Sequence, residues 1–130
     1  MTSPDLKGQL TATVSHISLL RTASANGAAL DTQQYQGDLL ALVECAAKTA
    51  GTNPTADFTL EDSADNSSFA GNTAALSAAF TQVTTVAATQ TRKVDLRATR
   101  RYVRLVFTIG GTSSPSFSFS SHFIGQLKVI

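Results

Sequence analysis

From residue 116 to residue 130 the chain alternates apolar and polar positions. The apolar set lies at odd numbers: Phe117, Phe119, Phe123, Leu127 and Val129. The even positions are mostly polar: Ser116, Ser118, Ser120, His122, Gln126 and Lys128. Side chains of an extended strand alternate between two faces, whereas a helix would scatter these phenylalanines around its circumference. The stretch therefore predicts a β-strand that buries one face and leaves the other in water.

Other segments carry the same period of two. Residues 101–109 and 56–61 each place their large apolar side chains on one parity, and two shorter strands are predicted at 80–86 and 91–96, with Val94 and Leu96 pointing inward. In the segment that starts at Gln9, apolar Leu10, Ala12 and Val14 alternate with polar residues before the parity changes. This change predicts a strand with an irregularity near His16.

The connections between these strands are predicted from turn residues and from composition. Residues 110–115 are rich in Gly, Ser and Pro, and are expected to join 101–109 to the last strand as an antiparallel hairpin. Asn26-Gly27 is a favourable turn pair. Residues 38–47 are apolar on both parities, which favours a central strand covered on both sides, although the period alone also allows a helix. Residues 73–80 fit either a short helical turn capped by Asn72 or an irregular segment.

Seven or eight short strands in so small a chain favour two packed layers, because a single sheet would leave one face of Phe and Leu wet. The predicted fold is an all-β, single-domain antiparallel β-sandwich of the jelly-roll kind over residues 9–130. Residues 1–8 contain Pro4 and Gly8 and little apolar content, and are expected to form a loose N-terminal arm.

Composition and charge narrow the class of protein. The chain has 130 residues and a formal net charge of +1, so no strong positive field would collect nucleic acid or an anionic membrane. No window approaches a membrane span and no secretory signal is recognisable at the N-terminus. The single Cys45 cannot form an internal disulfide. Charged residues make up only 15%, which suits a surface partly covered by neighbours.

Catalytic and metal-binding patterns are weak. His16 and His122 are the only histidines, and a hydrolytic triad needs a base beside a nucleophile and an orienting acid. We expect His122 to lie on a sheet face and His16 to bond backbone at the irregularity. One cysteine and two distant histidines give no paired metal-ligand spacing. The sequence therefore predicts neither an enzyme nor a cofactor.

Six of the ten cationic residues cluster before and within one strand: Arg92, Lys93, Arg97, Arg100, Arg101 and Arg104. Tyr102 lies between Arg100 and Arg104, where a guanidinium can stack on its ring or fork to a carboxylate. One interpretation is a wet sheet face whose charges meet the acidic run 57–65, in this chain or in a neighbour. The alternative is a docking patch for an acidic protein surface.

Several of these segments, taken in order, resemble the small head-decoration, or cement, proteins of tailed bacteriophages. The matching features are 30–37 before the apolar strand 39–43, then 58–63 with its polar loop to Ser68-Phe69, and above all 94–96 followed by 100–106 (RRYVRLV). The similarity covers about residues 28–130. The loop after Glu61 has Asp65-Asn66 where a glycine is commoner in the family, and the insertion 71–80 is longer.

The resemblance implies a β-sandwich that binds the outside of an assembled capsid, commonly as a homotrimer, with the major capsid protein as its partner and the virion surface as its location. On this expectation the cationic cluster, Tyr102 and the arm residues Pro4, Asp5 and Lys7 are the candidates for interface contacts. Two rivals remain open. One is a different virion component, such as a tail or fibre-associated adaptor, and the other is a small carbohydrate- or ligand-binding sandwich.

Overall fold

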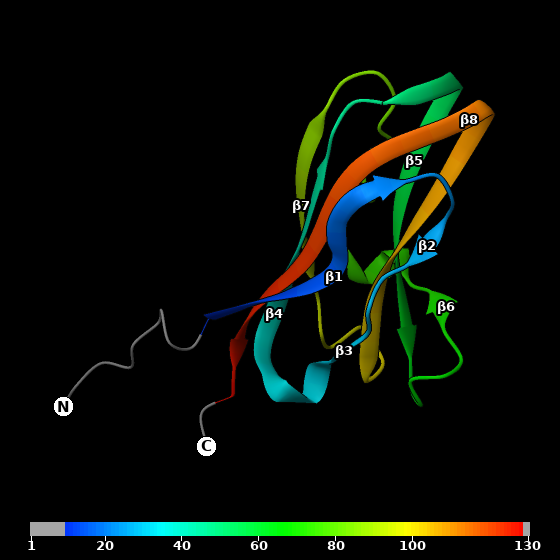
Figure 1. Cartoon of the computed structure of the whole chain (residues 1–130). Helices are drawn as coiled ribbons and strands as arrows, with labels where there is room; N and C mark the ends of the chain where they lie inside the picture. The colour runs from blue at the N-terminus through cyan, green and yellow to red at the C-terminus, as the bar shows by residue number, and fades with distance from the viewer. Residues whose placement is uncertain (1–9, 129–130) are drawn as a thin grey trace.

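The computed structural model describes residues 10–128, which form eight strands and two short 3-10 helices (Figure 1). The strands are β1 (Leu10–Arg21), β2 (Ala25–Asn26), β3 (Leu30–Asp31), β4 (Tyr35–Cys45), β5 (Ala50–Ser63), β6 (Ala70–Gly71), β7 (Ala88–Val94) and β8 (Tyr102–Leu127). The 3-10 helices are η1 (Thr32–Gln34) and η2 (Thr73–Ala75). The predicted all-β antiparallel sandwich is confirmed. The arm 1–8, Gln9 and Val129 lie outside the described residues.

Strand β8 belongs to both layers of the sandwich. Its first half, 102–116, pairs with β5 on one side and with β2 and β3 on the other. Its second half, 117–127, lies between β1 and β4, and β4 continues the layer to β7. We call the layer β1–β8–β4–β7 sheet A, and the layer that holds β2, β3, β5, β6 and the first half of β8 sheet B. In Figure 1, β8 climbs through sheet B and turns near its label before descending through sheet A.

The predicted hairpin at 110–115 is wrong. The two segments that it was expected to pair are halves of one bent strand and belong to different sheets. Positive φ angles at Gly111, Ser113 and Ser114 mark the bend. Strands that change sheet at a corner are typical of sandwiches whose layers share a strand.

The core lies between the two sheets and is built from the predicted parities. Phe117, Phe119 and Phe123 of sheet A are buried, as predicted, and belong to one core cluster with Phe58 and Phe107 of sheet B. The ring centroids of Phe107 and Phe119 are 4.4 Å apart, and Phe58 meets Phe119 edge-on at 5.0 Å. Burying one such side chain contributes about 1.5–3 kcal/mol to folding.

Three other predictions are wrong. Strand β4 is central, but only its odd positions are buried, and Leu40 and Leu42 face outward, so it is not covered on both sides within this chain. Residues 80–86 form no strand and contribute one bridge, Val83 to Ala56. Asn26 is not in a turn, because it lies in β2 opposite Val106.

Further predictions hold in part. A strand forms at 88–94, with Val94 buried and Leu96 partly buried, where 91–96 was predicted. The helical turn after Asn72 forms as η2, but the Asn72 side chain does not cap it. Its amide donates instead to Asp62 and to the Ala98 carbonyl. The irregularity near His16 is confirmed, since the β1–β8 register shifts on both sides of that residue.

Candidate docking surfaces

Arg100 is held by Asp62 of the same chain. Its guanidinium lies 2.9 Å from the Asp62 carboxylate and also donates to the Asp62 carbonyl, and its backbone N–H donates to the other carboxylate oxygen. Asp62 is buried and accepts a further bond from Asn72. Burial raises the pKa of Asp62, but the bonds from the Arg100 N–H, Asn72 and the guanidinium outweigh it and leave this pKa below its ordinary value.

Arg101 and Arg104 are paired in the same way. Arg101 forks to Asp31 with distances of 3.2 and 3.0 Å, and its guanidinium lies 5.0 Å from the Tyr102 ring. Arg104 donates twice to Glu61, its cross-strand partner in β5, and stacks 3.9 Å from the Phe69 ring centroid. Tyr102 itself is half-buried in the first pair of β8 with β5. The acidic run 57–65 therefore neutralises Arg100 and Arg104 within the chain, and Asp31 neutralises Arg101.

The remaining cations lie on or beside β7. Arg92 donates to the carbonyls of Ala79 and Thr91 and lies over the Phe80 ring. Lys93 pairs with Asp38 at 3.0 Å, and Arg97 pairs with Asp95 at 3.4 Å. With 91% of its side chain exposed, Arg97 is the cation of the cluster most available to a partner.

The structure thus favours the first interpretation of the cluster, a wet surface whose charges are paired within the chain. The interface role of these residues stays a prediction. Pro4, Asp5 and Lys7, the arm candidates, lie outside the described residues.

A second surface, not apparent in the sequence, covers the outer side of sheet A. Cross-strand pairing places Ala12, Ile124 and Leu40 in one row. The next row contains Val14, His122 and Leu42. We call this surface the apolar face, made of Leu10, Ala12, Val14, Leu40, Leu42 and Ile124.

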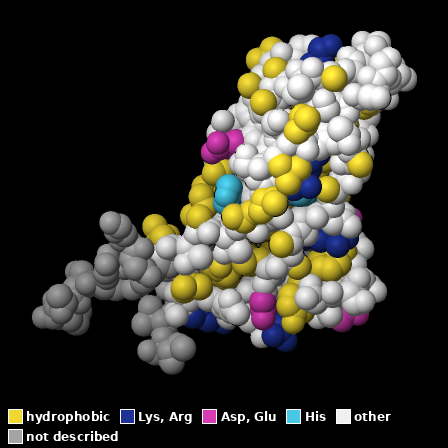
Figure 2. All heavy atoms as spheres, viewed as in Figure 1, with side chains coloured by type: hydrophobic (Ala, Val, Ile, Leu, Met, Phe, Trp, Pro, Cys, Tyr) yellow, Lys and Arg dark blue, Asp and Glu magenta, His cyan; other side chains and the backbone are white. Residues whose placement is uncertain are grey.

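The apolar face is open to solvent. Leu10 is 52% exposed, Val14 41% and Leu40 37%. Beyond the irregularity, β1 adds Ile17, Leu19 and Leu20 as further exposed apolar side chains. Figure 2 shows hydrophobic atoms gathered in a band across the side of the molecule on which β1 lies. Single exposed apolar residues are common, whereas contiguous apolar surface marks interaction sites.

Buried polar groups join the two sheets where β1 of sheet A meets β2 of sheet B. We call this region the seam; it contains His16, Ser121, Ala25 and Gly27. His16 lies in β1 of sheet A, and its Nε2–H donates to the carbonyl of Ala25 in β2 at 3.0 Å, because a carbonyl only accepts. The neutral ring then leaves Nδ1 to accept the hydroxyl of buried Ser121 at 2.7 Å. Burial lowers the pKa of His16, and the positive charge of Arg21 lowers it further. The bond to the Ala25 carbonyl raises this pKa, but the net result is a pKa below the ordinary value. The predicted backbone bond of His16 is confirmed.

Gly27 fits the same seam. Its N–H donates to the Leu105 carbonyl at 2.7 Å, and a Cβ at this position would lie 2.7 Å from that oxygen and collide with the Ser15 hydroxyl. The backbone that crosses from sheet A to sheet B can therefore approach this closely only without a side chain. Ser121 was missed in the sequence, although it is a polar residue on the buried parity of the last strand.

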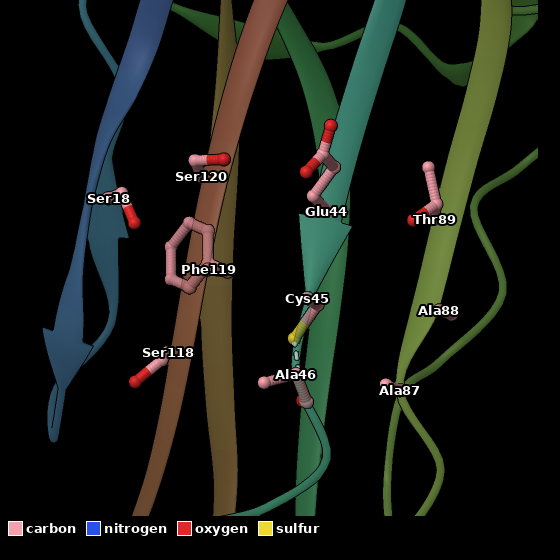
Figure 3. Close-up of a pocket in the computed structure, with 10 residues that line it drawn as sticks. All are labelled: Ser18, Glu44, Cys45, Ala46, Ala87, Ala88, Thr89, Ser118, Phe119 and Ser120. Carbon is pink, nitrogen blue, oxygen red and sulfur yellow. Dashed lines mark hydrogen bonds between the residues drawn. The ribbon is translucent and has the colours of Figure 1, made fainter.

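A hollow of about 400 Å³ lies at the end of sheet A where β1, β8, β4 and β7 meet (Figure 3). Hydroxyl groups of Ser18, Ser120 and Thr89 and the Glu44 carboxylate line it. Its one aromatic residue, Phe119, is buried and packs against the core rings. A sugar site would use converging aromatic side chains, so the hollow does not favour the ligand-binding rival.

Between residues 10 and 128 no group of three or more His, Cys, Asp or Glu side chains is arranged to hold a metal ion. Within the same range, no helix has the length and apolar character required to cross a membrane. Comparison with protein-family models and with curated proteins finds no match.

Proposed function

We propose that this protein is a structural virion component that binds the outside of an assembled tailed-phage head as a decoration, or cement, protein. The observation that carries the proposal is the apolar face, an open surface on three neighbouring strands of a rigid sandwich. The resemblance of residues 28–130 to phage decoration proteins supplies the partner, the major capsid protein. It also supplies the expected homotrimer and the outer capsid surface as the location.

The apolar face suits such a role for a physical reason. Strands β4 and β8 are hydrogen-bonded on both sides and β1 is bonded to β8, so their side chains are held in fixed positions and little conformational entropy is lost when a partner covers them. Burying apolar area contributes roughly 25 cal/mol per Å², and this gain is not reduced by the salt that screens surface charges. We therefore assign the main contact to the apolar face and a peripheral contact to Arg97.

The mechanism is mechanical. A protein that bridges adjacent capsid subunits makes the loss of one subunit require the loss of contacts to several. Because it binds the assembled shell and not free subunits, it also stabilises the shell by mass action. The packed genome presses outward, and the bridges oppose that pressure.

Co-sedimentation with empty heads of the phage that encodes the protein tests the proposal. We expect saturable binding at a fixed number of copies per head, together with a higher temperature of head disruption. Heads that bind no protein at saturating concentration would contradict the proposal, and binding to tails alone would favour the adaptor rival.

A charge variant tests the peripheral contact. Double reversal of Arg100 and Arg104 is a poor choice, because it would place negative charge beside Asp62 and Glu61 and disturb the fold. Arg97→Glu places its negative charge beside Asp95, but both side chains are exposed to water, which screens the repulsion, so the fold is disturbed far less. We expect a several-fold loss of affinity that diminishes at high salt, and an unchanged melting temperature. Unchanged affinity at low salt would remove Arg97 from the interface.

A further inference from the structure

The two edges of sheet A differ in how they are protected. The outer edge of β7 is covered by the segment 75–81: Ser77 N–H donates to the Lys93 carbonyl, Asp95 N–H donates to the Ala75 carbonyl, and Leu76 forms a bridge with Val94. Side chains add to this cover, since Gln90 bonds both backbone groups of Thr81. The strand also carries Arg92 and Lys93, and charge on an edge is a common protection against unwanted pairing.

The outer edge of β1 has none of these features over its first five residues. Within the described chain, residues 10–14 pair with β8 alone, and no loop or side chain bonds their other side. The sequence Leu10–Thr11–Ala12–Thr13–Val14 contains no charge and no proline. Cover begins only at Ser15, whose carbonyl accepts from Ala28 N–H. The register shift at His16 ends the regular edge.

We propose that this edge pairs with the same edge of a second copy, antiparallel and about a two-fold axis at Ala12. In this register Ala12 lies opposite Ala12 of the other copy, Leu10 opposite Val14, and Thr11 opposite Thr13. Every facing pair matches in character. Like charges facing each other would oppose pairing, and none occur in this register. An alternating strand always matches itself in such a register, so a second copy is a partner that can use this uncovered edge without any further requirement. The edge carries neither the charge nor the proline that commonly prevents such pairing.

The pairing would join two sheets A into one continuous sheet. Leu10 and Val14 would meet across the axis on the outer side, so the two apolar faces would become one surface of twice the area. A two-fold contact is closed, because each copy uses its single β1 edge, and the register shift at His16 limits its length. The dimer is therefore a discrete species and not the start of a fibre.

The pairing itself does not depend on the proposed function. If both hold, the two-fold contact would connect neighbouring homotrimers on the shell, where three-fold positions are related by two-fold axes. The tests below use the isolated full-length protein, so their failure leaves the head-binding experiment unaffected.

Cysteine crosslinking tests the register. Ala12→Cys places two thiols opposite each other, whereas Ala70→Cys, at an exposed alanine of β6 in sheet B, reports random collision. The native Cys45 is buried, and burial raises its pKa to about 11, so it competes little for oxidant. With oxidised glutathione, we expect Ala12→Cys to form disulfide dimers at least tenfold faster than Ala70→Cys. Equal rates would overturn the proposal.

Two further single variants test which residues face each other. Leu10→Cys and Val14→Cys are each expected to crosslink slowly alone and rapidly when mixed, because each residue faces the other across the axis. Rapid crosslinking of Leu10→Cys alone would contradict the assigned register.

A charge variant tests the contact without a crosslink. Ala12→Lys would place two like charges on the axis, at a position that is exposed and leaves the fold intact. In sedimentation equilibrium, the average mass of the wild type and of Ala70→Lys should rise with concentration towards double that of the dissociated form. Ala12→Lys should stay at the lower mass with an unchanged melting temperature. Identical curves for Ala12→Lys and Ala70→Lys would overturn the proposal.

Discussion

The outer faces of the two sheets are built from the same alternating strand pattern. On sheet B the exposed charged side chains find partners within the chain, whereas on sheet A apolar side chains are left in contact with water. On sheet B, Arg104 finds Glu61 across the strand pair and Phe69 beneath its guanidinium, and Asp57 accepts from Gln82. On sheet A, the equivalent positions carry Val14, Leu40 and Ile124. One face is complete within a single chain, whereas the other is an apolar surface open to solvent. In this protein, clustered charge is therefore a weaker guide to an interface than apolar surface that is left exposed to solvent.

The largest change in stability is expected when the pair of Asp62 with Arg100 beside sheet B is broken. Asp62→Ala removes a buried carboxylate, leaves the Arg100 N–H without its acceptor and leaves the Asn72 amide with the Ala98 carbonyl alone. We expect the free energy of unfolding to fall by about 3 kcal/mol, measured by chemical denaturation. The control Asp95→Ala removes an exposed carboxylate and should change stability far less. Equal losses in the two variants would contradict the structural role of Asp62.

A pH dependence is expected from the seam where the two sheets meet. The folded state holds His16 neutral and lowers its pKa, so between this value and about 6.5 the unfolded chain binds more protons. Stability is therefore full above about pH 6.5 and falls on acidification, by at most about 1.4 kcal/mol per pH unit. Thermal melting between pH 7.5 and pH 5 measures this slope. His16→Gln should reduce it, and the control His122→Gln should keep it; the reverse pattern would refute the assignment.

A smaller effect is expected from the outer face of sheet B. Arg104→Lys keeps the charge but loses the fork to Glu61 and the flat stacking on Phe69. We expect a loss of about 1 kcal/mol in the free energy of unfolding. A double-mutant cycle with Glu61→Gln measures how much of this loss comes from the interaction between Arg104 and Glu61. A coupling energy of zero would show that the pair contributes nothing to stability.

The sequence predicted strands better than it predicted what covers them. A period of two identified β1, β5 and both halves of β8, because alternation depends only on the chain itself. It could not show that Leu10, Ala12 and Val14 face solvent, since the side that is covered depends on the strands packed against β1. Strand β4 was expected to be covered on both faces because residues 38–47 are apolar on both parities. The sequence could not show that no further layer of the described chain covers Leu40 and Leu42. The hairpin at 110–115 failed because turn residues show that a chain changes direction, but not that it changes sheet.

The candidate sites show the same limit. The cationic cluster was visible because its members are close in sequence. The apolar face was not, because its residues come from β1, β4 and β8 and meet only through register. The hydrogen bond at the seam could have been suspected from Ser121, a serine between Phe119 and Phe123 on the buried parity of the last strand. Its partner His16 lies 105 positions away in the chain, beyond the reach of any local pattern.

The central claim is that the apolar face is covered when the protein acts, and head binding by one pair of variants tests it most directly. Leu40→Lys places a charge in the middle of the apolar face, whereas Val86→Lys places the same charge at an apolar side chain that is 75% exposed and outside both sheets. Val86→Lys should change the free energy of unfolding by no more than about 0.5 kcal/mol. Leu40→Lys sets a second positive charge opposite Lys93 of β7 and should cost about 1 kcal/mol, which leaves the protein folded. In co-sedimentation with empty heads, we predict that Val86→Lys binds like the wild type and that Leu40→Lys loses at least tenfold in affinity. Wild-type binding by Leu40→Lys would contradict the account.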